Sequence, residues 1–141
     1  QAIQKVDILF ANEEEARLLS SEFNLVRAGR QLQSSGPEVI IVKKGEHGAM
    51  VFGRNFVFSV VANPCENVVD PTGAGDAFAG AFLGYLASRG ESNRREIKKA
   101  AVYGNLVASL AIEDFGLDGL LRASQLDLIQ RYKNFKKIIS F

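Results

Sequence analysis

The most informative segment of this sequence reads Asp70-Pro71-Thr72-Gly73-Ala74-Gly75-Asp76-Ala77, and an apolar run over residues 78–86 follows it at once. The pattern predicts a tight turn that opens a helix, with Thr72 as the N-cap and Asp76 in the first helical turn. Such a turn directs uncovered backbone N–H groups and the positive end of a helix dipole at one spot, which suits an anion. A carboxylate beside a bound phosphate can accept the proton of an alcohol that attacks it. The same residue types also occur in turns that only cap a helix.

The rest of the chain alternates apolar strands with amphipathic helices. Runs of β-branched and apolar residues predict strands at 6–10, 38–43, 49–52 and 56–61, the last two forming a hairpin. Periodic apolar residues predict helices at 12–19, 25–33, 75–89, 94–113 and from Ser124 onward. Apolar strands followed by helices are typical of an α/β fold, with a mostly parallel sheet covered on both faces.

Length and composition exclude several classes of protein. A chain of 141 residues with 47% hydrophobic and 23% charged residues is typical of one globular domain. Seventeen Lys and Arg against sixteen Asp and Glu argue against a nucleic-acid partner, which usually requires a basic surface. The single cysteine, Cys65, excludes an internal disulfide and favours a cytoplasmic location. The longest apolar run, residues 77–87, is too short to span a membrane.

A second motif, Asn12-Glu13-Glu14-Glu15, follows the first predicted strand. Asn at the N-cap with Glu three residues later predicts a capping box, which is a purely structural role. A helix that begins at the carboxyl end of a strand is also where α/β folds bind ligands, so both interpretations can hold together.

Three motifs together resemble the PfkB, or ribokinase-like, family of sugar and nucleoside kinases: residues 70–77 with the small residues after them, residues 12–15, and the strand end and glycine turn at 43–48. The resemblance covers residues 6–129 and only the C-terminal half of such kinases. It implies a three-layer αβα ribokinase-like fold, with residues 1–141 as one domain that lacks the acceptor half and the lid. The G-x-x-x-x-G-K-[ST] phosphate-binding motif does not occur in the sequence.

The resemblance also implies a reaction, the transfer of the ATP γ-phosphoryl group to a hydroxyl of a small sugar or nucleoside. In that reaction Asp76 would be the base. The N–H groups of Gly73, Ala74 and Gly75 would form the anion hole.

The family places further residues around the nucleotide and its ions. The implied nucleotide-binding residues are Asn12, Lys43, Gly45, Gly48 and Asn105. Glu15 would hold Mg²⁺ through water, and Asp70 and Thr72 would contribute to a K⁺ site of the kind that some members have. Lys43 can equally extend into solvent, and Asn105 can equally be an ordinary residue of a helix face.

A rival interpretation is a non-catalytic nucleotide-binding fragment or structural remnant, because nothing in the sequence resembles an acceptor pocket. We expect the 141-residue chain to fold and to bind ATP weakly with Mg²⁺, without sugar kinase activity. A missing half would leave apolar surface exposed, so we also expect self-association, as in a homodimer.

Overall fold

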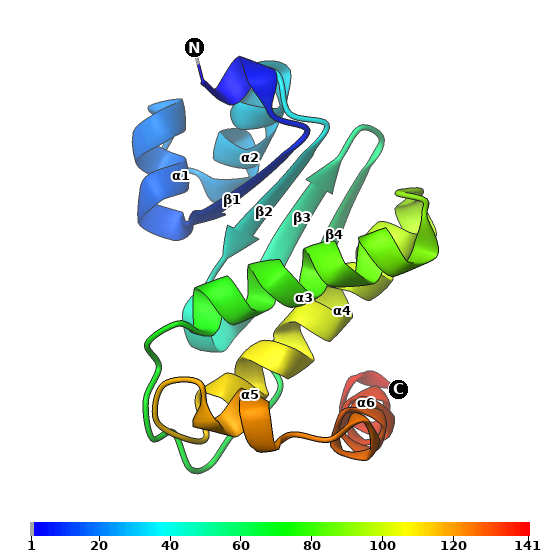
Figure 1. Cartoon of the computed structure of the whole chain (residues 1–141). Coiled ribbons are helices and arrows are strands. Elements are labelled where there is room, and N and C mark those ends of the chain that lie inside the picture. Colours follow the sequence, from blue (N-terminus) through cyan, green and yellow to red (C-terminus); the bar gives the residue numbers. More distant parts are fainter. Residues whose placement is uncertain (1) are drawn as a thin grey trace. The chain divides into compact units, whose positions relative to one another are not determined.

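The computed structural model describes residues 2–141, which divide into two compact units. The first unit ends at Val60 and the second runs from Val61 to Phe141. A sheet with helices makes up the first unit, and helices make up most of the second (Figure 1).

The first unit contains a four-stranded sheet in the order β1-β2-β3-β4. β1 pairs with β2 in parallel, whereas β2 with β3 and β3 with β4 are antiparallel. The elements of this unit are η1 (Ile3–Lys5), β1 (Ile8–Asn12), α1 (Glu13–Ser20), α2 (Leu25–Ser34), β2 (Val39–Lys43), η2 (Gly45–His47), β3 (Ala49–Gly53) and β4 (Phe56–Val60).

The predicted α/β class is confirmed, but the sheet is mixed rather than mostly parallel. The helices α1 and α2 form the long connection that a parallel pair such as β1 and β2 requires. Short turns join β2 to β3 and β3 to β4, and a short turn permits only antiparallel pairing. The predicted hairpin is therefore confirmed, while the first strand begins at Ile8, two residues later than predicted.

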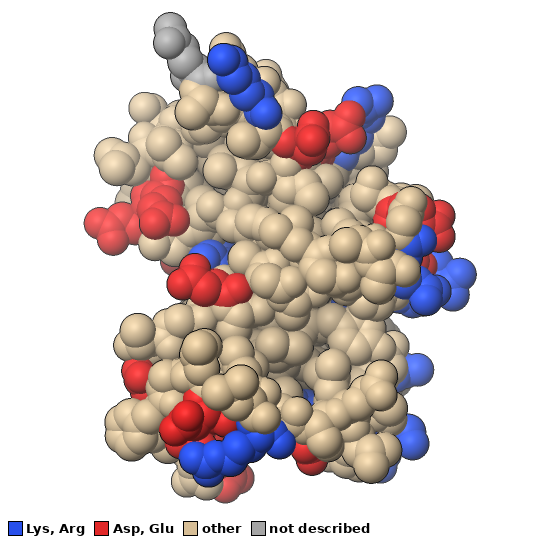
Figure 2. Space-filling model, in the orientation of Figure 1, with Lys and Arg blue, Asp and Glu red and all other residues tan. Residues whose placement is uncertain are grey.

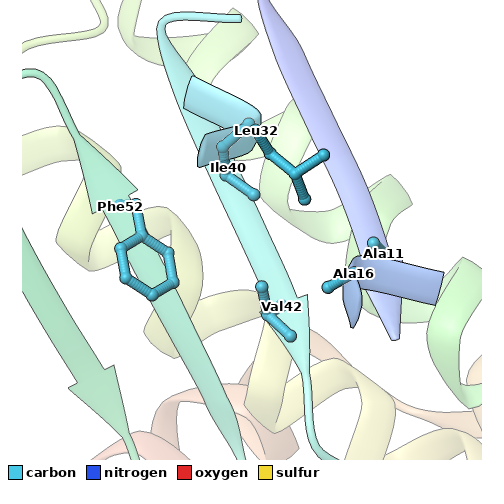
Figure 3. Close-up of a cluster of buried hydrophobic side chains, with 6 residues drawn as sticks. All are labelled: Ala11, Ala16, Leu32, Ile40, Val42 and Phe52. Carbon is cyan, nitrogen blue, oxygen red and sulfur yellow. The ribbon is translucent and has the colours of Figure 1, made fainter. Parts of the chain in front are cut away.

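The core of the first unit lies between the sheet and its two helices. Figure 3 shows the buried cluster formed by Ala11, Ala16, Leu32, Ile40, Val42 and Phe52. Ile40 and Val42 share one face of β2 because side chains alternate along a strand. α2 approaches this cluster closely at Gly29, where an added Cβ would overlap Cε2 of the Phe52 ring. Glycine at this position therefore allows the helix to pack on the aromatic ring.

The second unit begins with an irregular segment and continues as four helices. They are α3 (Ala74–Arg89), α4 (Arg94–Ala111), α5 (Asp118–Arg122) and α6 (Gln125–Ile139). α3 buries Phe78, Phe82 and Leu86, four residues apart along one stripe. α4 packs on α3 at Gly104, where a Cβ would lie 2.9 Å from the carbonyl oxygen of Phe78. Within residues 2–141, no helix is long and apolar enough to cross a membrane.

All three tyrosines of the chain form one stack across three helices of the second unit. The ring centroids of Tyr85 in α3 and Tyr103 in α4 are 4.9 Å apart, and those of Tyr103 and Tyr132 in α6 are 5.4 Å apart. The Tyr85 hydroxyl donates to Oε2 of the buried Glu96 at 2.7 Å. Burial is the main cause that raises the pKa of Tyr85 to about 12. The stack therefore links α6 to the helical pair α3 and α4.

Acidic and basic side chains are interspersed over the face of the molecule that Figure 2 shows. This distribution agrees with the near balance of charges in the sequence, whose net charge is +1.

We expect Gly29→Ala to lower the free energy of unfolding by about 1–3 kcal/mol, because the new methyl group would overlap the buried Phe52 ring. Denaturant unfolding followed by far-ultraviolet circular dichroism measures this change. The matched control is Gly80→Ala in α3, where the added Cβ would meet no described atom within 4 Å apart from its chain neighbours and the backbone of its own helix. That variant should gain up to about 1 kcal/mol from helix propensity. Equal stability of Gly29→Ala and the wild type would contradict the close packing of α2.

Candidate functional site

α3 begins at a backbone turn rather than at a capping side chain. Gly73 is the N-cap, with φ of 81° and ψ of −3°, in the left-handed region that glycine adopts without strain. The prediction of Thr72 as N-cap is therefore wrong by one residue, because the left-handed turn delays the start of the helix. Beyond the adjoining residues, no described atom lies within 4 Å of a Cβ at Gly73, so conformation rather than space requires glycine here.

The first turn of α3 directs amide groups outward beside a carboxylate. The Ala74 amide donates to the preceding turn, and the Ala77 amide makes the first helical bond, to the Gly73 carbonyl at 2.9 Å. Between them lie the amides of Gly75 and Asp76, at a position where a helix offers no internal acceptor. The Asp76 side chain is exposed in this same turn. One turn therefore combines helix-start donors with an accessible carboxylate, as the sequence predicted.

Hydrogen bonds tie the segment before α3 to the end of α4. The amides of Val69 and Asp70 both donate to the carbonyl oxygen of Ile112, at 2.8 and 3.2 Å. Oδ1 of Asp70 in turn accepts the Thr72 amide at 2.9 Å. Hydrogen bonds from Thr72, the backbone one first, lower the pKa of Asp70, and the Gly116 amide adds to them. Asp70 therefore holds the turn in shape, and its contact with a cation stays a prediction.

Asn12 and Glu15 form the predicted capping box at the start of α1. Asn12 Oδ1 accepts the Glu15 amide, and Glu15 Oε2 accepts the Asn12 amide, both at 2.8 Å. Asn12 is also the register partner of Lys43 across the parallel strands β1 and β2. The structure thus brings three of the predicted site residues together at the carboxyl end of these strands.

The two glycines after β2 have a conformational reason to be glycine. Gly45 has φ of 56° and Gly48 has φ of 87°. The Lys44 amide donates to the Gly48 carbonyl at 2.7 Å, which closes the turn between β2 and β3. A contact of either glycine with a nucleotide stays a prediction.

Asn105 lies on α4 and is 7% exposed. Its Oδ1 accepts the backbone amide of Asn63 at 3.2 Å. Its Nδ2 is buried and has no hydrogen-bond partner among residues 2–141. A buried donor without an acceptor is costly, so Nδ2 of Asn105 is an exception among the buried side-chain atoms of the described residues.

A polar network that sequence reasoning missed surrounds Asn63. Its Nδ2 donates to Ser109 Oγ at 3.3 Å, and Nη1 of Arg131 donates to the same oxygen at 2.9 Å. Arg131 also makes a bidentate ion pair with Glu113, at 3.0 and 2.7 Å. Asn63 lies in the segment before α3, Ser109 in α4, Glu113 in the link between α4 and α5, and Arg131 in α6. Because these residues are far apart in the sequence, no local sequence pattern could have signalled their contact.

The described part of the chain holds no group of three or more His, Cys, Asp or Glu side chains that could form a metal site. Mg²⁺ retains most of its water ligands in phosphate sites and needs only one or two carboxylates from the protein. The exposed carboxylate of Glu15 fits that requirement, because capping uses its Oε2 and leaves Oε1 available to a metal-bound water.

Comparison with known proteins places this arrangement in a family context. The model of the pfkB family of carbohydrate kinases matches residues 1–123. A cytidine kinase of Thermococcus kodakarensis is 39% identical over 91 residues, which are 63% of this chain and 33% of that protein. A nucleoside kinase of Methanothermobacter thermautotrophicus is 31% identical over 116 residues, covering 82% of this chain and 35% of that protein.

Solved structures show the same fold. A fructokinase of Vibrio cholerae, crystallised with fructose, ADP and calcium ion, matches with a TM-score of 0.82 at 26% identity, over 92% of this chain and 42% of that one. The ribokinase-like fold is therefore confirmed. The chain spans about a third of the length of the two curated relatives above.

The lowered pKa of Asp70 predicts a pH dependence of stability. Because the folded-state pKa lies below the unfolded value, ionised Asp70 stabilises the fold above pH 3.8, and this contribution disappears as the pH falls through the lowered value. Asp70→Asn should therefore be less stable than the wild type at pH 7, and the difference should shrink below about pH 4. Thermal melts from pH 7 to pH 2.5 measure this. A difference that does not change with pH would contradict the assignment.

Proposed function

The chain belongs to the pfkB family of carbohydrate kinases, and from this premise we propose that it is the C-terminal, ATP-binding and catalytic half of such a kinase. The reaction is transfer of the ATP γ-phosphoryl group to a hydroxyl of a sugar or nucleoside. The observation that carries the proposal is the start of α3, where a left-handed glycine, helix-start amides and an exposed carboxylate share one turn. Relatives named as cytidine and nucleoside kinases support a small hydroxyl-bearing acceptor such as a nucleoside.

Asp76 is the base in this proposal. Its carboxylate accepts the proton of the acceptor hydroxyl while the hydroxyl oxygen bonds to the γ-phosphorus and the bond to ADP breaks. The N–H groups of Gly73, Ala74 and Gly75 form the anion hole for the transferred group, with the Ala74 N–H shared between that group and the Pro71 carbonyl, which it already contacts at 3.3 Å. Amides held at a helix start stabilise developing negative charge without reorganising, and the helix dipole adds to their effect.

Asn12, Glu15 and Lys43 act on the phosphates and their metal ion. Bound Mg²⁺ supplies positive charge that neutralises the phosphate oxygens. The capping box orients the Glu15 carboxylate, whose Oε1 would accept a hydrogen bond from a water on that ion. Lys43, which pairs with Asn12 in register, contributes a second positive charge at the same strand ends.

The nucleoside end of ATP is assigned to Gly45, Gly48 and Asn105. The buried Nδ2 of Asn105 would donate to an acceptor nitrogen of the base, which removes the cost of an unpartnered donor. Asp70 and Thr72 would help to hold K⁺ beside the anion hole, mainly through backbone carbonyl groups.

A second candidate function is nucleotide binding without catalysis. It is favoured by one observation, that the chain spans only about a third of the length of its curated relatives. ATP turnover that depends on an added sugar or nucleoside distinguishes the two functions. Turnover by the 141-residue chain itself would exclude the non-catalytic function.

We expect Asp76→Asn to reduce turnover of the full-length gene product by at least about 100-fold, because the variant lacks the base. The affinity for ATP should stay within about tenfold, since the amides of the anion hole remain. Phosphoryl transfer to a panel of sugars and nucleosides, together with ATP titration, measures both quantities. Asp118→Asn is the matched control, because Asp118 is also an exposed carboxylate in a first helical turn. A wild-type rate in Asp76→Asn would rule out Asp76 as the base.

The role of Glu15 can be separated from its capping role by Glu15→Gln. Glutamine still accepts the Asn12 amide, so the loss of stability should stay below about 1 kcal/mol. Loss of the negative charge should nevertheless raise the Mg²⁺ concentration needed for ATP binding severalfold. Asp127→Asn changes the equivalent residue of the capping box of α6 and serves as the control. An unchanged Mg²⁺ requirement in Glu15→Gln would leave Glu15 with a structural role alone.

A further inference from the structure

A continuous chain of hydrogen bonds joins α6 to Asn105. Nη1 of Arg131 donates to Ser109 Oγ at 2.9 Å, and Asn63 Nδ2 donates to the same oxygen at 3.3 Å. The Asn63 backbone amide then donates to Oδ1 of Asn105 at 3.2 Å. All four residues belong to the second unit, where α4, α6 and the irregular segment before α3 contribute to the chain of bonds.

The direction of each bond in this chain is determined. The Ser109 hydroxyl donates its only hydrogen to the Leu106 carbonyl at 2.7 Å, so it can only accept from Arg131 and Asn63. A backbone amide can only donate, so the atom of Asn105 that faces Asn63 must be the oxygen. The Nδ2 group of Asn105 is therefore turned away from Asn63, toward the buried position where it lacks a partner.

Arg131 is itself held in place. Its side chain is only 20% exposed, and its guanidinium group binds both carboxylate oxygens of Glu113. A planar guanidinium fixed by two parallel bonds is a rigid donor, and its Nη1 also donates to Ser109 Oγ.

We infer that Arg131 is a positioning residue for nucleotide binding, which through Ser109 and Asn63 sets the Asn105 amide so that Nδ2 meets the base of the nucleotide. The inference rests on the proposed function for the identity of the ligand. It extends the site to α6, which lies beyond residues 1–123 that the family model matches.

Two variants test the chain of bonds against a matched control. Arg131→Ala removes its first donor, and Ser109→Ala removes the shared acceptor while Arg131 and Glu113 stay paired. The control is Arg122→Ala: Arg122 lines the same cavity of about 340 Å³ as Arg131 and pairs with Asp114 at 3.1 Å, but it contacts neither Ser109 nor Asn63. Thermal melts identify a variant that does not fold: if Arg131→Ala does not fold, Ser109→Ala carries the test, and if Ser109→Ala does not fold, Arg131→Ala carries it.

The first readout compares ATP with inorganic tripolyphosphate, which has the phosphates but lacks the base. Titration of the 141-residue chain should show ATP binding weakened about two- to tenfold in Arg131→Ala and Ser109→Ala, the range for one neutral hydrogen bond. Tripolyphosphate binding should not change, and Arg122→Ala should match the wild type with both ligands. Equal weakening with both ligands, or no weakening in Arg131→Ala, would overturn the positioning role.

The second readout needs no ligand. In nuclear magnetic resonance spectra of the ligand-free chain, the Asn105 side-chain amide signals should shift in Arg131→Ala and Ser109→Ala but not in Arg122→Ala. If the Asn105 side-chain signals stay at their wild-type positions in both Arg131→Ala and Ser109→Ala, the inference is overturned. A wild-type chain that binds neither ATP nor tripolyphosphate would refute the proposed nucleotide site, and these spectra would then decide separately whether Arg131 positions Asn105.

Discussion

The carbonyl oxygen of Ile112 is the fixed point of the second unit, because it accepts the amide hydrogens of both Val69 and Asp70. A short link over residues 90–93 joins α3 and α4 at one end, and this pair of bonds closes the other end. The turn at Gly73 is consequently held on both sides: the residues before it are bonded to the end of α4, and α3 begins directly after it. Such restraint is what an anion site of backbone amides requires, since donors that must first reorganise stabilise developing charge less well.

α4 combines packing with polar recognition along its length. Gly104 lets the backbone of α3 approach, and the next residue, Asn105, carries a buried donor that has no partner within residues 2–141. One turn further along α4, the Ser109 hydroxyl donates to a backbone carbonyl of the same helix and accepts hydrogen bonds from Asn63 and Arg131. A satisfied polar network inside a protein is rigid, so the unpaired Nδ2 of Asn105 is an exception in the network that the described residues form.

The features that the sequence predicted are local ones. The helix start near Gly73 and the capping box at Asn12 depend on residues within four positions of one another, and the structure contains both. The antiparallel pairing of β2 with β3 was not predicted, because a central strand buried on both faces has the same apolar sequence in parallel and antiparallel pairs. Ser109 and Arg131 were missed because their contacts span 22 and 46 positions and leave no periodic pattern. The catalytic roles stay predictions that no contact within the chain can test.

The tyrosine stack has a consequence for spectroscopy. The chain contains no tryptophan, and its three tyrosines all belong to the second unit, where they stack on one another. Near-ultraviolet absorption, circular dichroism and intrinsic fluorescence therefore report almost entirely on the packing of α3, α4 and α6. The first unit contributes only the weak signals of phenylalanine. Two compact units in one chain can thus be followed separately without a label, one through its aromatic signal and the other through the backbone signal of its sheet.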